Sequence, residues 1–159
     1  MSGEFTESDF EDLSWHDCHV WGFELRPPDP DNNDWRSELA LDIDYIVEWI
    51  CRTDGGATFR VAPATLVFRD VSDLCIDCDF RSEGPPATIQ PASVDDIERT
   101  PTSARLGREA GERWNWKIAL NWPQGGSMTF AASGFSMRLR REPVETPEQS
   151  LSPRVRRGG

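Results

Sequence analysis

The sequence predicts a mainly β fold: an antiparallel β-sandwich or curved sheet of about seven strands, with at most one short helix. Two observations favour this class. Several segments alternate apolar with polar side chains, which is the period of a half-buried strand, and turn-forming glycine and proline residues separate these segments. The length of 159 residues is typical of one domain with a single core.

The first hairpin is predicted from residues 38–50, where the odd positions from Leu39 to Trp49 are all apolar. The opposite face of this strand carries Glu38, Asp42, Asp44 and Glu48. Some of its apolar residues also fall at helical spacing, but the β-branched and aromatic side chains favour a strand. The Asp-Gly-Gly sequence at residues 54–56 then predicts a tight turn into residues 57–61.

A second hairpin is predicted from residues 114–122 to residues 127–132, across the turn Pro-Gln-Gly-Gly. Further strands are expected at residues 19–25, 64–71, 74–80 and 135–140. Ser93 precedes Val94 and two aspartates in the order of a helix N-cap, so one short helix is expected at residues 93–98.

The two ends of the chain differ in composition from its body. Residues 1–12 are polar and acidic, and we expect them to form a mobile arm. Residues 142–159 contain little that a core can bury, and we expect a disordered tail. Residues 13–141 then form a single β domain, in which residues 82–112, rich in Pro, Gly, Ser and Thr, are a long connection.

The net charge is −11, and residues 1–48 hold nearly all of the imbalance, with 14 acidic and 2 basic side chains. This excess disfavours binding to nucleic acid phosphates and favours a cationic partner.

The sequence has no apolar run of about 18 residues and no basic, apolar leader, so neither a membrane segment nor secretion is expected. We therefore predict a cytoplasmic location, where the cysteines stay reduced.

Both histidines of the chain lie in Ser-Trp-His-Asp-Cys-His-Val-Trp, residues 14–21. His16, Asp17, Cys18 and His19 are all of the types that bind zinc, and a site requires three or four such side chains to converge. In an extended strand His16 and His19 point to opposite faces, so a metal site requires a turn or a bulge here. The alternative is a structural cluster that is hydrogen-bonded at the start of a strand and holds no cofactor.

Signals for catalysis are weak. Cys75 and Cys78 have the C-x-x-C spacing, but a strand sends them to opposite faces, so Cys78 is expected in the core. Asp42 and Asp44 form an acid/base pair only if their face lines a cleft, and such a face is more often solvated. No phosphate-binding loop, dinucleotide fingerprint or nucleophile elbow occurs.

Residues 154–159 resemble the Gly-Gly end of ubiquitin-like modifiers, over these six residues only.

Three segments carry a family resemblance: Trp15-His16-Asp17, the strand from Leu41 to Ile46, and the segment from Pro63 to Phe68. They resemble small bacterial proteins of unknown function, some of which are similar to toxin-immunity proteins. The resemblance lies within residues 13–80 and implies a protein-binding role without assigning any site residue.

Together these observations predict a non-enzymatic, immunity-type domain that binds a basic protein through its acidic surface, with Asp42, Asp44 and Glu48 in contact with the partner. The alternative hypothesis is a small zinc-binding protein or metal-assisted enzyme that uses His16, Asp17 and His19.

Overall fold

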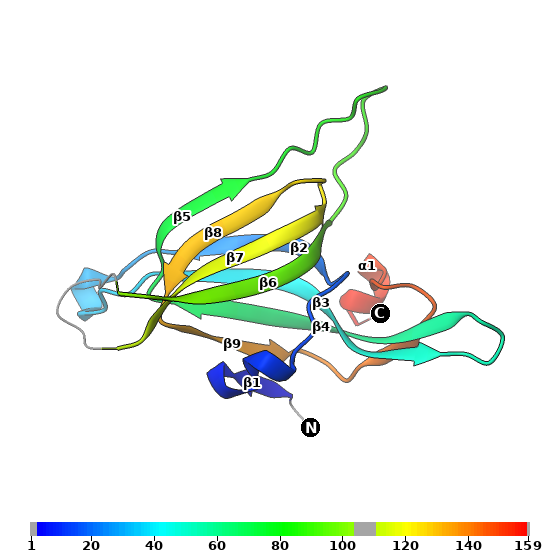
Figure 1. The fold of residues 1–159 in the computed structure, drawn as a ribbon, viewed down its shortest axis with the longest axis horizontal. Coiled ribbons are helices and arrows are strands. Elements are labelled where there is room, and N and C mark those ends of the chain that lie inside the picture. Colours follow the sequence, from blue (N-terminus) through cyan, green and yellow to red (C-terminus); the bar gives the residue numbers. More distant parts are fainter. Residues whose placement is uncertain (1–2, 104–110, 159) are drawn as a thin grey trace.

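The computed structural model describes residues 3–103 and 111–158, and Figure 1 shows a mainly β chain. Ten strands pair in one antiparallel sheet in the order β1-β9-β4-β3-β2-β6-β7-β8-β5, with β10 beside β4. The strands are β1 (Glu4–Thr6), β2 (His19–Arg26), β3 (Glu38–Cys51), β4 (Ala57–Arg69), β5 (Ser72–Asp77), β6 (Ala92–Thr102), β7 (Arg113–Trp122), β8 (Ser127–Ala132), β9 (Gly134–Leu139) and β10 (Val144–Thr146). The short helical elements are η1 (Glu7–Asp12), η2 (Pro30–Asn32) and α1 (Pro153–Arg156).

The predicted mainly β, antiparallel fold is confirmed, with ten strands in the described residues where about seven were predicted, and both predicted hairpins form. β3 pairs with β4, and β7 pairs with β8. Most of the alternating apolar side chains face the core, and Leu41 and Ile43 of β3 and Ile118 of β7 are buried. The alternation fails at Val47 and Trp49, which are exposed because the register of β3 shifts between Ile46 and Glu48. Residues 57–61 and 64–71, predicted as two strands, lie largely within the single strand β4, which passes through Pro63. Among residues 3–103 and 111–158, no helix is long and apolar enough to cross a membrane.

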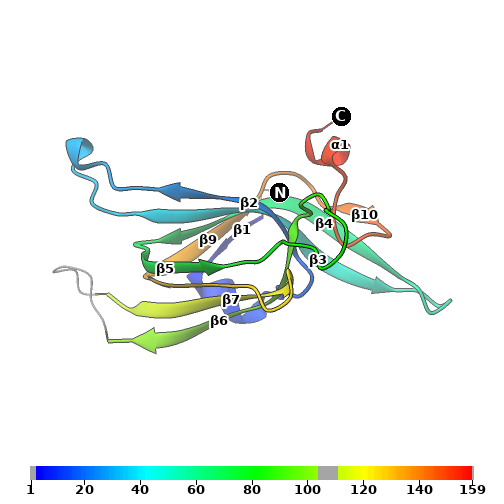
Figure 2. The same cartoon turned by 90° about the horizontal axis from the view of Figure 1, so that it is seen from above.

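The sheet bends so that two halves face each other across the core (Figure 2). One half contains β1, β9, β4, β3 and β2, and the other contains β6, β7, β8 and β5. Within the described residues, the halves pair only where the start of β2 meets the start of β6. Phe68 of the first half packs against Trp116 of the second, with ring centroids 5.0 Å apart. The protein is therefore a sandwich made from one curved sheet.

Residues 93–98, predicted as a short helix, belong instead to β6. A register shift between Val94 and Asp96 places a β-bulge at Asp95. The bulge adds one residue, so Val94 and Ile97 are both buried although they lie three positions apart. A three-residue spacing of buried side chains is also typical of a helix, which explains the wrong prediction. β6 also occupies part of the long connection predicted for residues 82–112, of which residues 104–110 lie outside the described part.

Both ends of the chain fold onto the sheet, which corrects the predictions of a mobile arm and a disordered tail. β1 pairs with β9, and η1 follows it with Phe10 buried. At the other end, β10 pairs with β4, Leu151 is buried and α1 follows. A few apolar side chains are thus enough to attach each polar segment to the core. Residues 1–2 of the predicted arm and Gly159 of the modifier-like end lie outside the described residues.

Candidate functional site

The Trp-His-Asp segment forms a tight turn just before β2. Asp17 has a φ of 62°, a left-handed conformation that aspartate tolerates better than most residues. Its carboxylate accepts hydrogen bonds from Asn121 Nδ2 at 2.7 Å and from Gln149 Nε2 at 2.8 Å. These bonds attach the turn to the end of β7 and to the C-terminal segment (residues 142–158). Asp17 therefore connects three parts of the fold.

The other predicted zinc ligands point to different places. A ring nitrogen of the exposed His16 lies 3.2 Å from the carbonyl oxygen of Asp95, and a ring nitrogen of His19 lies 3.0 Å from that of Asp17. Cys18 is fully buried, and burial raises the pKa of its thiol to about 12, which disfavours the thiolate that metals bind. Within residues 3–103 and 111–158, no three His, Cys, Asp or Glu side chains form a group able to hold a metal ion.

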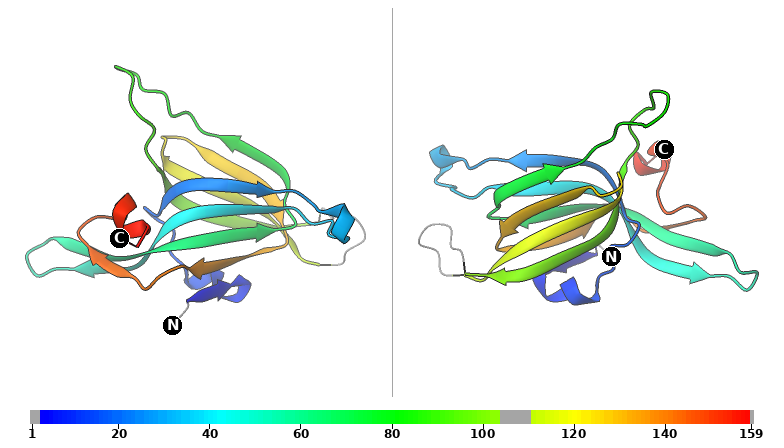
Figure 3. Two further views of the ribbon diagram at one scale, coloured as in Figure 1. Left: turned by 180° about the vertical axis from the view of Figure 1, so that it is seen from behind. Right: turned by 45° about the horizontal axis from the view of Figure 1, so that its top comes forward.

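Asp44, in the acidic row of β3, is fully buried. Its Oδ2 atom accepts hydrogen bonds from Trp21 Nε1 at 2.9 Å and from the Leu151 amide at 2.8 Å. The guanidinium group of Arg156 pairs with its Oδ1 atom and lies 4.7 Å from the centre of a Trp21 ring. A buried carboxylate requires this kind of compensation. The C-terminal segment supplies it, and Figure 3 shows α1, in red, beside the half of the sheet that contains β3.

This arrangement corrects the prediction that Asp42, Asp44 and Glu48 form one exposed partner-binding row. Asp44 is closed off from solvent by the chain itself. Asp42 remains partly exposed but pairs with Arg156, and Glu48 pairs with Arg60 at 3.4 Å. The alternation that identified the row is correct, but arginines of the same chain neutralise its charges.

A cleft opens between β2 and β5, on the side where the two halves of the sheet are not joined. β2 pairs with β6 only at its first two residues, and a register shift around Trp21 marks the β-bulge after which the strands separate. The cleft has a volume of about 470 Å³. Its apolar lining includes Val20, Phe23, Ile76, Cys78, Phe80 and Ile89. We refer to it as the β2–β5 cleft.

Two apolar side chains of β2, Phe23 and Leu25, lie on the inner face of the sheet but are not covered. Phe23 lies opposite Leu41 and Leu25 lies opposite Leu39, so each shares the inner face of the sheet with a fully buried leucine. Even so, Phe23 is 49% exposed and Leu25 is 56% exposed, because β6 no longer lies beside this part of β2. Ile89, in the connection to β6, is 77% exposed. Grouped exposed apolar side chains of this kind mark interaction sites.

The chain segments that continue from the two walls of the β2–β5 cleft are acidic. Residues 24–38, at the β2 end, carry five carboxylates and two arginines, and residues 73–83, along and after β5, carry four carboxylates and one arginine. Trp35, in the connection between β2 and β3, is 69% exposed and follows Asp34 directly. The cleft therefore combines an apolar lining with acidic segments that lead away from it, and we refer to these segments as its rim.

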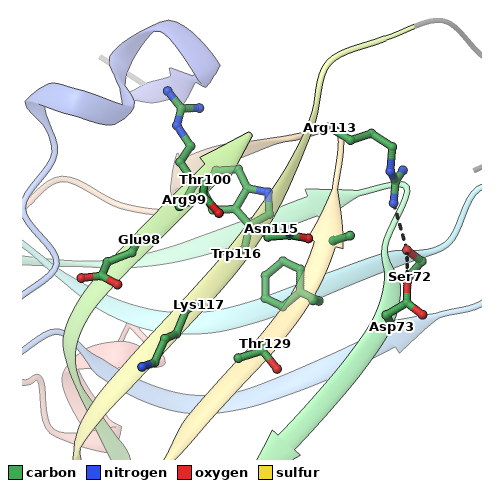
Figure 4. Close-up of a pocket in the computed structure, with 12 residues that line it drawn as sticks. Ser72, Asp73, Glu98, Arg99, Thr100, Arg113, Asn115, Trp116, Lys117 and Thr129 are labelled. Atoms are coloured by element: carbon green, nitrogen blue, oxygen red, sulfur yellow. Dashed lines mark hydrogen bonds between the residues drawn. The ribbon is translucent and has the colours of Figure 1, made fainter. Parts of the chain in front are cut away.

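A second depression, of about 540 Å³, lies on the outer face of β6, β7 and β8 (Figure 4). Glu98, Lys117 and Thr129 are neighbours there, because Lys117 stands opposite each of the other two in the sheet register. Arg113 turns toward Ser72 and donates a hydrogen bond to its hydroxyl at 3.0 Å. No histidine or cysteine occurs among the residues that line this depression, and its mixed charges are typical of a solvated sheet face.

Comparison of the chain with protein-family models, with curated proteins and with solved structures finds no match. The candidate site therefore rests on geometry. The β2–β5 cleft was not predictable from the sequence, because the strand at residues 19–25 carries no sign of which strand faces it. The alternation of Phe23 and Leu25 indicated a strand, but no local pattern showed that these side chains stay uncovered.

Proposed function

We propose that this protein is a non-enzymatic binding domain that takes a basic protein partner at the β2–β5 cleft. The observation that carries the proposal is the exposure of Phe23, Leu25 and Ile89 on surfaces that line or adjoin the cleft. Apolar and aromatic anchors at the centre of an interface contribute most of its binding energy, and polar residues form its rim.

The charge of the rim supports a basic partner. Arg26 is already occupied by Glu24 at 3.2 Å and Glu38 at 3.3 Å, and Arg36 lies 3.6 Å from Asp34. Asp29 and Asp31 form no ion pair with a described residue of the chain, so their charge remains for a partner. Such a rim attracts a cationic surface and accelerates its association, and salt weakens the effect.

Among binding roles, an immunity-type role in a bacterial cytoplasm agrees with both the sequence resemblance and the acidic surface. An inhibitor of this type covers the active surface of a basic toxin, and affinity then depends on a few buried anchors inside a complementary charged ring.

The test is affinity isolation from an extract of the host organism with the immobilised full chain. We compare the wild type with the double variant Phe23→Ser/Leu25→Ser and with the matched control Val47→Ser. Val47 is an exposed apolar residue of β3 that does not line the cleft. We expect one basic protein to bind the wild type and Val47→Ser, to be lost with the double variant, and to elute at about 0.5 M salt.

Two results would contradict the proposal. One is that no retained protein distinguishes the double variant from Val47→Ser. The other is that the protein which does distinguish them is acidic and stays bound at high salt.

A further inference from the structure

The wall of the β2–β5 cleft at β2 is a free strand edge. β6 begins beside Val20 and runs the opposite way past His19, so no described residue pairs with this edge from Trp21 to Arg26. β5 likewise pairs with β8 on one side, and no described strand lies on its other side. Free edges present unpaired N–H and C=O groups, which are a template for another strand.

We infer that the partner enters the β2–β5 cleft as one extended strand that pairs with the free edge of β2, with apolar side chains turned into the cleft and basic side chains turned outward. This inference rests on the proposed function and specifies how the partner is recognised. It follows the mode in which an extended peptide adds a strand to an exposed sheet edge.

Such a strand would lie beside the part of β2 to which β6 does not extend. β6 pairs antiparallel with the first two residues of β2, so the sheet has a partner there and loses it after the bulge. The Trp21 side chain bonds to Asp44 and stacks with Arg156, so the C-terminal segment fixes it at the acidic site on β3. A Cβ atom added at Gly22 meets no atom within 4 Å, so the face of β2 that carries Glu24 is open at this point.

Alternation of side chains explains why a basic, amphipathic sequence fits. Successive residues of a strand point to opposite faces, so every second side chain of the added strand faces Phe23, Leu25 and Ile76. The intervening side chains lie on the outer face, where Glu24 is exposed. A second copy of this chain would place one acidic rim against another at a net charge of −11 per chain, which disfavours self-association.

The probe is a displayed library of random 12-residue peptides, selected on the immobilised full chain at low ionic strength. We expect enriched peptides to alternate apolar with basic residues over about six positions, and not to bind Phe23→Ser/Leu25→Ser. One enriched peptide is then synthesised in two forms, with backbone N-methyl groups on alternate residues of one edge or of the other. We expect one form to lose at least about tenfold in affinity while the other binds as before.

Enriched peptides without alternation, the absence of enrichment, or equal binding of the two N-methylated forms would overturn the inference. So would a dimer of this chain that dissociates in Phe23→Ser/Leu25→Ser, since the occupant would then be a second copy. If capture of a basic host protein still requires Phe23 and Leu25 in these cases, the proposed function stands and only the strand mode fails. If that capture does not require them, the proposed function itself fails.

Discussion

The opening between β9 and β6 and the opening between β2 and β5 lie on different sides of the same sandwich, and among the described residues only the first is filled by a segment of the chain. There, η1 places Phe10 with ring centroids 5.3 Å from Trp116 and 5.7 Å from Phe135. Arg99 of β6 pairs with Glu7 and Glu11 of η1, which fastens this N-terminal segment across the two halves. Phe10 is only 7% exposed as a result.

The β2–β5 cleft also lies between the two halves of the sheet, but no described segment of the chain fills it. Its side chains Phe23 and Leu25 are about half exposed, although they lie on the same face as the core. Exposed apolar surface forgoes stabilisation of roughly 25 cal/mol per Å². Because a short polar segment with one phenylalanine is sufficient to fill the first opening, the exposure of Phe23 and Leu25 supports our proposal that the second opening receives another molecule.

The largest expected effect is on the filled side. Phe10→Ala removes a buried ring that touches both halves of the sheet, and we expect the free energy of unfolding to fall by about 3–5 kcal/mol. Urea unfolding followed by tryptophan fluorescence measures this. The matched variant Phe23→Ala, on the open side, should lose less than about 1 kcal/mol. Equal losses would show that the two sides do not differ as described.

The next effect concerns the C-terminal segment, which packs against the bulge where β2 leaves β6. Arg156→Ala leaves the buried Asp44 carboxylate without its ion-pair partner, and we expect a loss of about 3 kcal/mol. Arg154→Ala, a change at an exposed arginine of the same helix, is the control and should change stability by less than about 0.5 kcal/mol. Equal stability of Arg156→Ala and the wild type would mean that the segment does not hold this part of the fold.

The filled side should also respond to alkaline pH. Tyr45 packs against Phe5 and Trp15 of the N-terminal segment, and burial raises the pKa of its hydroxyl from 10.0 to about 12. The folded state therefore holds a proton that the unfolded state releases, so this contribution to stability is complete below pH 10 and is lost as the pH rises to about 12. Urea unfolding at several pH values should show a smaller decline for Tyr45→Phe than for the wild type. Identical declines would assign the effect to other groups, such as Cys18.

The smallest effect on stability is expected at the rim of the open side. Trp35→Ser removes an exposed side chain, so the free energy of unfolding should change by less than about 0.5 kcal/mol. Affinity for the captured basic protein, measured by calorimetry, should nevertheless fall by about tenfold or more if Trp35 is an anchor. Unchanged affinity would limit the interface to the cleft itself.

Local patterns were sufficient to predict much of the fold. Alternation with a period of two identified β3 and β7, and the turn residues after each strand predicted the hairpins. The same reasoning failed at β6, where the bulge at Asp95 gives the buried residues helical spacing. It also failed at both ends, because one buried phenylalanine or leucine in a polar segment leaves no periodic signal.

The candidate site was less predictable than the fold. Asp44 was assigned to a solvated face, because its partner Arg156 lies 112 positions later and no local rule links the two. The β2–β5 cleft depends on where β2 and β6 separate, which is a property of the assembled sheet. The sequence shows the excess of acidic residues near the N-terminus. Only the folded chain shows that arginines of the same chain neutralise part of this negative charge.

The most direct test is amide hydrogen exchange of the full chain, free and with a selected peptide bound. We predict that the amides of residues 21–26 that point to the free edge of β2 exchange rapidly in the free protein and are protected on binding, whereas β1 and η1 are protected in both states. Protection that appears over the outer face of β6, β7 and β8, with none at residues 21–26, would contradict the account.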